Sequence, residues 1–278
     1  MKLSKKITSV FTGLVLTLSL AVPGTVLAAT SPDLGVAQSY SVLGHTTVTN
    51  TGATTMPGDL GVSIGGAPVG FPPGSVGPPG SIRNAGDSLA AQNANTAAYG
   101  AIDQPCDTTY PGTKDLVSEN LVAGVYCAGA FVLSGTLTLN GTGVWIFKSA
   151  STFITSGTAN VVGGDPCNVW WRDVSSATLG TNTQLTGNIL SSTSISMQTG
   201  ATLNGRALTQ TGAVTLDANV ITGAACLGTS TTTTAVVPGL PNAGVEPKQL
   251  ASSFNMALMS VSMIVFGGLY LVRKKLTI

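Results

Sequence analysis

Charged residues are scarce in this chain of 278 residues. Asp, Glu, Lys and Arg together make up 8% of the sequence, and the formal net charge is +1. Residues 29–228 contain five Lys and Arg residues against ten carboxylates, which gives this part a net charge of about −5. A protein that binds nucleic acid or anionic lipid needs a basic patch, and residues 29–228 have none. The composition therefore argues against both partners for this part of the chain.

Residues for nucleophilic or acid–base catalysis are equally scarce. The single histidine, His45, has no Ser or Cys motif around it, and the sequence contains no G-x-S-x-G. Asp165, Asp173 and Asp217 are candidates for a glycosidase pair only because β-solenoids also occur among polysaccharide-cleaving enzymes. No acidic repeat typical of calcium sites is present. The sequence therefore predicts no enzyme, no metal and no cofactor.

Only four cysteines occur: Cys106, Cys127, Cys167 and Cys226. An even number of cysteines in an exported chain favours disulfides, and four cysteines allow three pairings. We expect Cys106–Cys127, which closes the segment after a predicted helix, and Cys167–Cys226, which ties a central coil to the chain that leaves the domain. A tetrahedral zinc site is the alternative, but the sequence has no C-x-x-C spacing and His45 lies far away.

The N-terminus has the pattern of a secretory signal peptide. Residues 1–28 begin with Lys2, Lys5 and Lys6, continue with an apolar run near residues 10–22, and end on small residues before Ala29. The alternative is an uncleaved N-terminal anchor. Both interpretations predict that the chain leaves the cytoplasm.

Short apolar runs separated by glycine turns repeat through the body of the chain. The turn glycines Gly135, Gly157, Gly180 and Gly200 are separated by 22, 23 and 20 residues. A repeat of roughly 20 residues is typical of a solenoid, in which each coil buries its apolar side by stacking on its neighbours. The alternative is a β-sandwich, whose strands recur at shorter intervals. Small side chains at the turns and the lack of charge favour the solenoid.

One helix and one loop interrupt this pattern. Residues 84–102 are rich in Ala and are the only soluble helix candidate. Residues 34–50 are strand-like, whereas residues 51–80 are rich in Gly and Pro and should hold neither a helix nor a central strand. The positions near helical spacing in the predicted helix are Ala85, Leu89, Ala90, Asn93, Ala97 and Ala101.

Large aromatic and cationic side chains lie in or near the apolar strands. The tryptophans are Trp145, Trp170 and Trp171. Because an aromatic side chain in such a strand is more often part of the core than a ligand platform, we expect at least two of them to be buried. The cations are Lys148, Arg172 and Arg206. We expect each of these to be solvated or paired with a carboxylate at a corner.

Six ordered motifs occur between residues 143 and 217. They are GVWIF at 143–147, CNVWW at 167–171, SATLGT at 176–181, GNIL at 187–190, TGAT at 199–202 leading to NGRAL at 204–208, and GAVTLD at 212–217. Upstream, LG at 34–35, GDLGV at 58–62 and GFPPG at 70–74 belong to the same series. Over about residues 33–222 the chain resembles the microbial ice-binding protein family. The resemblance implies an irregular right-handed β-solenoid of triangular cross-section, with one long α-helix alongside and one flat face that adsorbs to ice.

Outward threonines on a solenoid would form a flat array that can order water in an ice-like lattice. Threonine is also a common strand and turn residue, and the sequence does not say which face each threonine occupies. The candidates for the ice-binding face are Thr136, Thr138, Thr155, Thr158, Thr178, Thr181, Thr183, Thr199, Thr202, Thr211 and Thr215.

The composition changes after residue 228. Residues 229–253 form a linker rich in Thr and Pro, residues 254–272 are apolar and long enough to cross a bilayer as a helix, and residues 273–278 are basic. The linker contains a short motif made of Leu240, Pro241, Asn242, Ala243 and Gly244. This order resembles the LPxTG cell-wall sorting signal that a sortase cleaves, except that Ala243 replaces Thr. By analogy the cut would fall after Ala243, and the uncut helix would be a membrane anchor.

The sequence thus predicts an exported, mainly β protein on the extracellular face of the cell envelope. Its expected partners are the ice crystal surface, the membrane through the C-terminal helix, and a sortase and the cell wall. The alternative is a surface adhesin or spacer without ice activity that contacts glycans. A flat face with Thr or Ser in register over at least three coils would favour ice.

Overall fold

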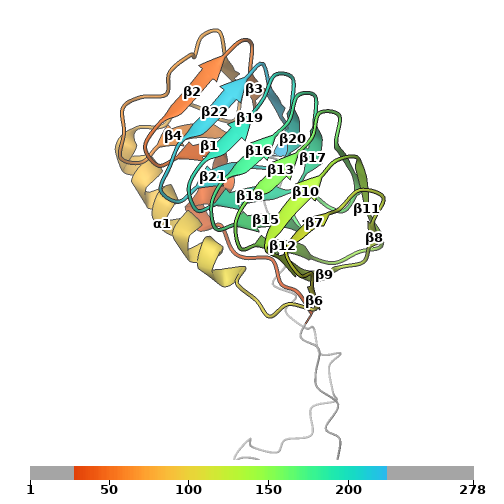
Figure 1. Cartoon of the computed structure of the whole chain (residues 1–278). Coiled ribbons are helices and arrows are strands. Elements are labelled where there is room, and N and C mark those ends of the chain that lie inside the picture. The colour runs from red at the N-terminus through yellow and green to blue at the C-terminus, as the bar shows by residue number, and fades with distance from the viewer. Residues whose placement is uncertain (1–27, 224–278) are drawn as a thin grey trace, which may run out of the picture. The chain divides into compact units, whose positions relative to one another are not determined.

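The computed structural model describes residues 28–223 (Figure 1). Several predictions lie outside these residues: the signal peptide, Cys226, the linker with its sorting motif, the 254–272 helix and the basic tail. No helix within the described residues is long and apolar enough to cross a membrane. Two compact units divide the chain at residue 228, and the fold described below belongs to the first of them.

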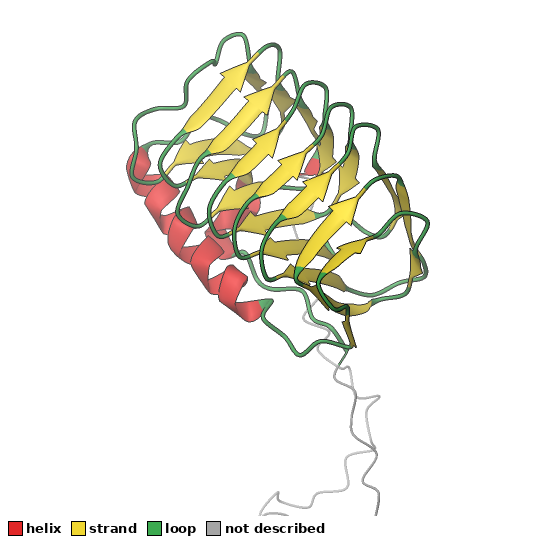
Figure 2. Cartoon of the chain, viewed as in Figure 1, coloured by secondary structure: helices red, strands yellow, loops and turns green. Residues whose placement is uncertain are grey.

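Three sheets of parallel strands form a three-sided coil, and each turn of the coil adds one strand to each sheet (Figures 1 and 2). Sheet A consists, in spatial order, of β4 (Asp59–Val62), β1 (Tyr40–Gly44), β21 (Ala207–Thr209), β18 (Asn188–Ser191), β15 (Val169–Asp173), β12 (Trp145–Ser149), β9 (Gly124–Ala128) and β6 (Thr108–Thr109). Sheet B consists of β2 (Val48–Thr51), β22 (Val214–Asp217), β19 (Ile195–Met197), β16 (Ala177–Leu179), β13 (Phe153–Thr155), β10 (Ala130–Leu133) and β7 (Thr113–Asp115). Sheet C consists of β5 (Ser75–Val76), β3 (Thr55–Met56), β23 (Val220–Ile221), β20 (Thr202–Asn204), β17 (Gln184–Thr186), β14 (Asn160–Gly163), β11 (Thr136–Leu139) and β8 (Asn120–Leu121). The predicted solenoid with one helix is confirmed.

The coils do not stack in chain order. The first coil, β1 to β3, lies beside the last one, because β1 pairs with β21, β2 with β22 and β3 with β23. The chain then passes through α1 (Ala85–Ala101) to the opposite end, where β6 to β8 begin the regular coils. A helix of 17 residues is about 25 Å long at 1.5 Å per residue, which is the height of about five coils. The helix therefore carries the chain along the solenoid.

Helix α1 matches the predicted range, but the predicted contact face is wrong. The positions proposed from the alanine pattern are exposed, and the helix instead packs through Ser88, Ala91, Gln92, Asn95 and Ala98. The amide groups of Gln92 and Asn95 both donate to the carbonyl of Thr209 in sheet A, at 2.9 and 3.0 Å. Because the sheet offers backbone acceptors here, polar and small residues face it and alanines face solvent. The cap is Asn84, whose side chain accepts the N–H of Asp87.

The interior of the coils is dry and aromatic toward the β6 end. Phe147 stacks on Trp171 with ring centroids 4.2 Å apart, and Phe153 stacks on the other side of Trp171 at 4.4 Å. Along the same inner column the residues shrink to Ile189 and Ala207 toward the opposite end. All three tryptophans are buried, which confirms the expectation of at least two.

The corner between sheets C and A is built from stacked glycines. Gly187, Gly205 and Gly223 occupy equivalent places in successive coils, and we call this corner the glycine edge. A Cβ atom on Gly205 would lie 1.8 Å from the carbonyl oxygen of Gly187, and one on Gly223 would lie 2.1 Å from the nitrogen of Gly205. No other residue fits this corner, which explains the 18-residue spacing of these glycines.

The Gly- and Pro-rich stretch differs in part from its prediction. Residues 51–80 hold no helix, but β3 lies between β23 and β5 and so occupies an inner position of sheet C. This strand comes before the Pro-rich part of the stretch, where every N–H is still available for pairing. Residues 34–50 begin as a short 3-10 helix, η1 (Gly35–Ser39), before β1 and β2.

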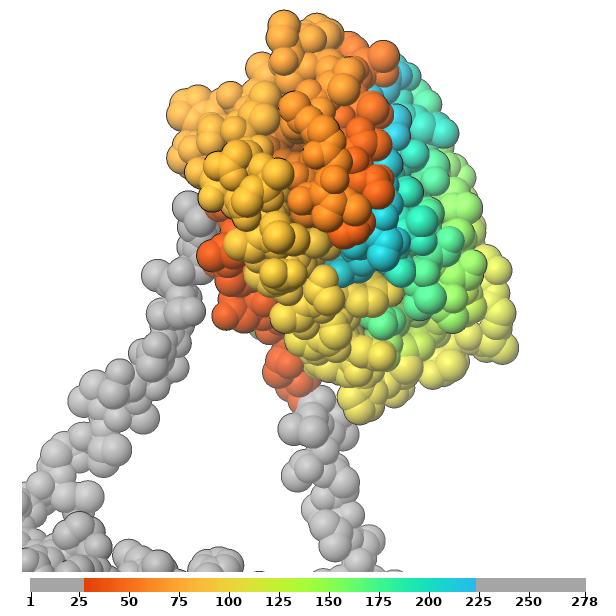
Figure 3. Space-filling view, turned by 90° about the vertical axis from the view of Figure 1, so that its left-hand side faces the viewer, coloured from red at the N-terminus to blue at the C-terminus, as the bar shows by residue number. Residues whose placement is uncertain are grey.

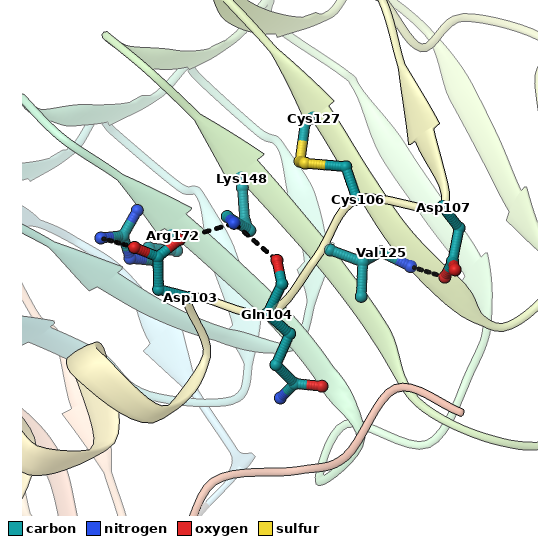
Figure 4. The surroundings of a disulfide bond; sticks show 8 residues. All are labelled: Asp103, Gln104, Cys106, Asp107, Val125, Cys127, Lys148 and Arg172. Carbon is teal, nitrogen blue, oxygen red and sulfur yellow. Dashed lines mark hydrogen bonds and ion pairs between the residues drawn. A yellow bond between two sulfur atoms is a disulfide. The ribbon is translucent and has the colours of Figure 1, made fainter. Parts of the chain in front are cut away.

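The predicted disulfide Cys106–Cys127 is confirmed, and it fastens the segment that follows α1 (Figure 4). Asp103 in the same segment pairs with Lys148 at 2.5 Å and with Arg172 at 3.6 Å, as expected for these two cations. Both contacts hold the pKa of Asp103 below its usual value, chiefly through the hydrogen bond from Lys148. The Cys167–Cys226 pair stays a prediction because Cys226 lies outside the described residues.

The prediction that Arg206 is a solvated or carboxylate-paired corner residue is wrong. Its side chain is 1% exposed and lies under the N-terminal segment. Nε and Nη2 donate to the carbonyl of Gln38 at 2.9 and 2.8 Å, and Nη1 donates to Oδ1 of Asn188 at 2.9 Å. Burial lowers the pKa of Arg206 to about 10. This guanidinium therefore binds neutral acceptors and locks the N-terminal segment onto sheet A.

Candidate binding face

The outer side of sheet A is already covered. Helix α1 and the N-terminal segment bury its outward residues in a second apolar cluster that includes Leu43, Ile146 and Trp170. Figure 3 shows this side, with the helix and the N-terminal segment lying over the coils. Only the outer sides of sheets B and C are therefore accessible to a large partner.

Small side chains point outward from sheet B in straight columns. The middle column runs, in register, through Thr49, Thr215, Ser196, Thr178, Ile154, Val132 and Asp115. The first four members carry hydroxyl groups on four adjacent coils, and the next two are β-branched aliphatic residues. Adjacent coils place these side chains about 4.8 Å apart. Except at Asp115, the column offers methyl and hydroxyl groups at one height.

Two further columns flank the middle one. The column before the strands contains only small residues: Thr47, Ala213, Ser194, Ser176, Thr152, Ala130 and Thr113. The column after them contains Thr51, Asp217, Gln198, Gly180, Ser156 and Ser134. We call the surface formed by these three columns face B. Because nearly all its side chains are short, face B is level over β2, β22, β19 and β16.

Sheet C also presents an uncharged outer side, but of mixed length. Its outward residues are Ser75, Thr55, Val220, Thr202, Gln184, Asn160 and Thr136 in one column, and Asn204, Thr186, Val162, Thr138 and Asn120 in the other. We call this surface face C. Flexible Asn and Gln side chains alternate there with Val and Thr, so face C has neither the uniform height nor the uniform chemistry of face B.

The eleven threonines predicted from the sequence do not share one face. Thr178 and Thr215 lie on face B, whereas Thr136, Thr138 and Thr202 lie on face C. The turns between sheets B and C hold Thr158, Thr181 and Thr199, and the turn between sheets A and B holds Thr211.

Two of these threonines point into the interior, which corrects their assignment to a binding face. Thr155 and Thr183 are 3% and 0% exposed, and their hydroxyl groups bond to each other at 2.6 Å. Thr155 ends a strand whose alternation places it inward, and Thr183 lies where the chain turns into β17. Each uses its hydroxyl to satisfy a buried partner.

Sequence reasoning missed half of the middle column. Thr49 belongs to the first coil and joins the face only because that coil stacks on the last one. Ser196 was overlooked because only threonines were considered. The alternation Ile195-Ser196-Met197, with its apolar residues buried, was the signal that could have found it.

Two carboxylates border the columns of face B. Asp115, at the β7 end, accepts hydrogen bonds from Oγ of Ser134 at 2.5 Å and from the N–H of Val117 at 3.0 Å. Burial raises the pKa of Asp115, but these hydrogen bonds outweigh it, and the pKa lies below its usual value. Asp217 accepts a hydrogen bond from Thr199. Charge is thus confined to the margin of the hydroxyl columns.

The carboxylates considered for glycosidase chemistry do not converge. Asp165 is exposed near the glycine edge, Asp217 borders face B, and Asp173 is completely buried at the corner of sheets A and B. Burial raises the pKa of Asp173 to about 7, although Ser191 donates a hydrogen bond to it at 2.6 Å. His45 lies at another level of that corner, with Nδ1 3.0 Å from Oγ of Ser63. Among residues 28–223 no group of three or more His, Cys, Asp or Glu side chains could hold a metal.

Comparison with known proteins gives concordant results. Residues 42–222 match the family model described as Ice-binding-like. The chain is 41% identical over 207 residues to an ice-binding protein of Nostoc sp. (strain HG1), covering 71% of this chain and 76% of that one. It is 32% identical over 209 residues to an ice-binding protein of Flavobacterium frigoris (strain PS1), covering 68% and 75%.

Solved structures show the same fold. An ice-binding protein from the Antarctic ascomycete Antarctomyces psychrotrophicus superposes with a TM-score of 0.65 at 37% identity, covering 69% of this chain and 98% of that one. An ice-binding protein from an Antarctic biological consortium superposes with a TM-score of 0.66 at 32% identity, covering 72% and 95%. Because these relatives consist almost entirely of the matching region, the coils and α1 form a unit that folds without the C-terminal segment.

Proposed function

Because the chain belongs to the Ice-binding-like family, we propose that it binds ice and that face B is the surface that adsorbs. The observation that supports face B is the run of hydroxyl groups in register on four adjacent coils: Thr178, Ser196, Thr215 and Thr49. Small residues flank this run on the side before the strands, and the covered sheet A cannot compete for a flat partner.

Adsorption follows from the physical chemistry of these columns. Methyl groups of Thr, Ile and Val favour removal from liquid water, while the hydroxyl groups bond to an ordered water layer. The spacing along one column is fixed by the backbone ladder at about 4.8 Å, so the waters it orders are held in a regular lattice. No side chain has to reorganise when such a layer joins the crystal. The bound molecule then blocks growth of the ice front at its own position.

The proposal includes export and display at the cell envelope. The signal-peptide pattern of residues 1–28 and the linker, apolar segment and basic tail after residue 228 support it. A disulfide at Cys106–Cys127 also suits an oxidising compartment. Processing of the LPNAG motif by a sortase, with attachment to the cell wall, belongs to the same proposal.

A pair of matched substitutions tests face B. In residues 29–228, Thr178→Tyr places a bulky ring in the middle of face B, and we expect thermal hysteresis to fall at least five-fold because the ice plane can no longer approach. Thr186→Tyr makes the same change on face C and should leave thermal hysteresis within a factor of two. Circular dichroism and thermal unfolding of both variants verify the fold.

The outcomes separate the functions under consideration. Loss in Thr186→Tyr but not in Thr178→Tyr would assign the activity to face C. Inactivity of the unsubstituted protein in thermal hysteresis and ice-recrystallisation assays would favour the adhesin or spacer function instead.

A further inference from the structure

The last described coil ends at the glycine edge. After β23 the N–H of Thr222 still bonds to the carbonyl of Leu203 at 2.9 Å, and Gly223 stacks directly on Gly205. A further strand would have to pair with β21 in sheet A, but β1 already occupies that position through Val42 and Ala207. The coil therefore cannot continue, and the path of the chain leaves the body at this edge.

The N-terminal end of the body is fixed near the same edge. The hydroxyl of Ser31 donates to Oδ1 of Asn168 at 2.8 Å and accepts from Nε1 of Trp170 at 3.1 Å. Asn168 lies in the turn between sheets C and A, just before β15. One residue earlier, the backbone N–H and carbonyl of Thr30 are both held by the side-chain amide of Gln104, at 3.0 and 2.7 Å.

The glycine edge is opposite face B. In a three-sided coil the corner shared by two sheets faces away from the third sheet, and the glycine edge is shared by sheets A and C (Figure 1). Neither end of the body lies on face B: Ser31 contacts residues at the start of β15, and Gly223 contacts Gly205.

From this arrangement we infer that the protein is held by its glycine edge through the chain after Gly223, so that face B points away from whatever holds it and meets the ice front directly. The inference rests on the proposed function of face B. It gives the exit point a role in binding: a load on the C-terminal side leaves the whole of face B free. A load at the corner between sheets A and B would tilt face B toward its support.

Beads coupled at two positions test the inference. Residues 29–228 carry a biotin at the C-terminus in one form and, in the other, Thr193→p-azidophenylalanine coupled to the bead by a short linker. Thr193 is exposed at the corner of sheets A and B and lies outside the three columns of face B. Both free proteins are first assayed for thermal hysteresis, which should be equal. Adsorption of beads with equal protein density to a growing ice crystal is then counted.

We expect beads coupled through the C-terminus to adsorb at least ten-fold more than beads coupled through residue 193. Equal adsorption of the two kinds of bead would overturn the inference, as would failure of the C-terminal beads when the free protein is active. A free protein without thermal hysteresis would instead contradict the proposed function, so the two failures are distinguishable.

Discussion

At the residue scale, Asp173 shows how a solenoid tolerates a carboxyl group inside its wall. The side chain is fully buried beside Ser191, and Oδ1 has no hydrogen-bond partner. Burial raises the pKa of Asp173 to about 7, so the folded protein favours the neutral acid up to near-neutral pH. The unfolded chain has the ordinary value of about 3.9.

This difference predicts a pH dependence of stability. The contribution of Asp173 is fully present below the unfolded pKa and is lost as the pH rises through the folded pKa of about 7. Asp173→Asn cannot ionise, so it should unfold at a higher denaturant concentration than the wild type at pH 8. Each pKa unit corresponds to about 1.4 kcal/mol, which limits the gain between pH 4 and pH 8 to about 4 kcal/mol.

Denaturant unfolding at pH 4, 6 and 8 measures this effect. Asp165→Asn changes an exposed carboxylate in the same way and should leave the pH profile of the wild type unchanged. If Asp173→Asn and the wild type lose stability in parallel between pH 4 and pH 8, Asp173 does not titrate as described.

Residue-scale chemistry was also where prediction from sequence was least secure. Side-chain type alone made Thr155, Thr183 and Thr178 equivalent candidates, yet the first two are buried and the third is on face B. Strand alternation places every second residue outward, but turns of different length reset the phase in each coil. The neighbour across the sheet, rather than the residue type, decides what a threonine does.

At the element scale, α1 is positioned by polar contacts and not by an apolar stripe. Ala98 is 1% exposed against sheet A, whereas the adjacent Ala97 faces solvent. Ala98→Leu should lower the free energy of unfolding by about 1 to 3 kcal/mol, because the added atoms have no space between helix and sheet. Ala97→Leu should stay within about 0.5 kcal/mol of the wild type.

Chemical unfolding of the two variants at one pH gives the comparison. The two alanines are neighbours with the same helix propensity, so a difference reports only the face on which each lies. A larger loss in Ala97→Leu would restore the contact face that the alanine pattern predicted.

At the scale of the whole molecule, the described disulfide closes the end of the solenoid where the regular coils begin. Cys106–Cys127 spans 21 residues and ties the segment after α1 to β9. A double substitution to serine should lower the free energy of unfolding by about 3 kcal/mol, as expected for a loop of this length. Thermal hysteresis at low temperature should persist, because face B at β16, β19, β22 and β2 lies several coils away.

Thermal unfolding and thermal hysteresis of the same preparation test both parts. Wild-type protein treated with a reductant serves as a second route to the open form. A loss of ice activity while the fold is intact would show that the end of the solenoid and face B are coupled.

The sequence by itself determined the kind of molecule. The period of about 20 residues, the shortage of charge, the range of α1 and the Cys106–Cys127 pair were all predicted from the chain, because each depends on local spacing or composition. Tertiary structure alone decided that β2 lies beside β22, that Thr49 completes the hydroxyl run, and that both ends of the body lie opposite face B. These features depend on which coil stacks on which, and α1 reorders the coils by carrying the chain from one end of the solenoid to the other.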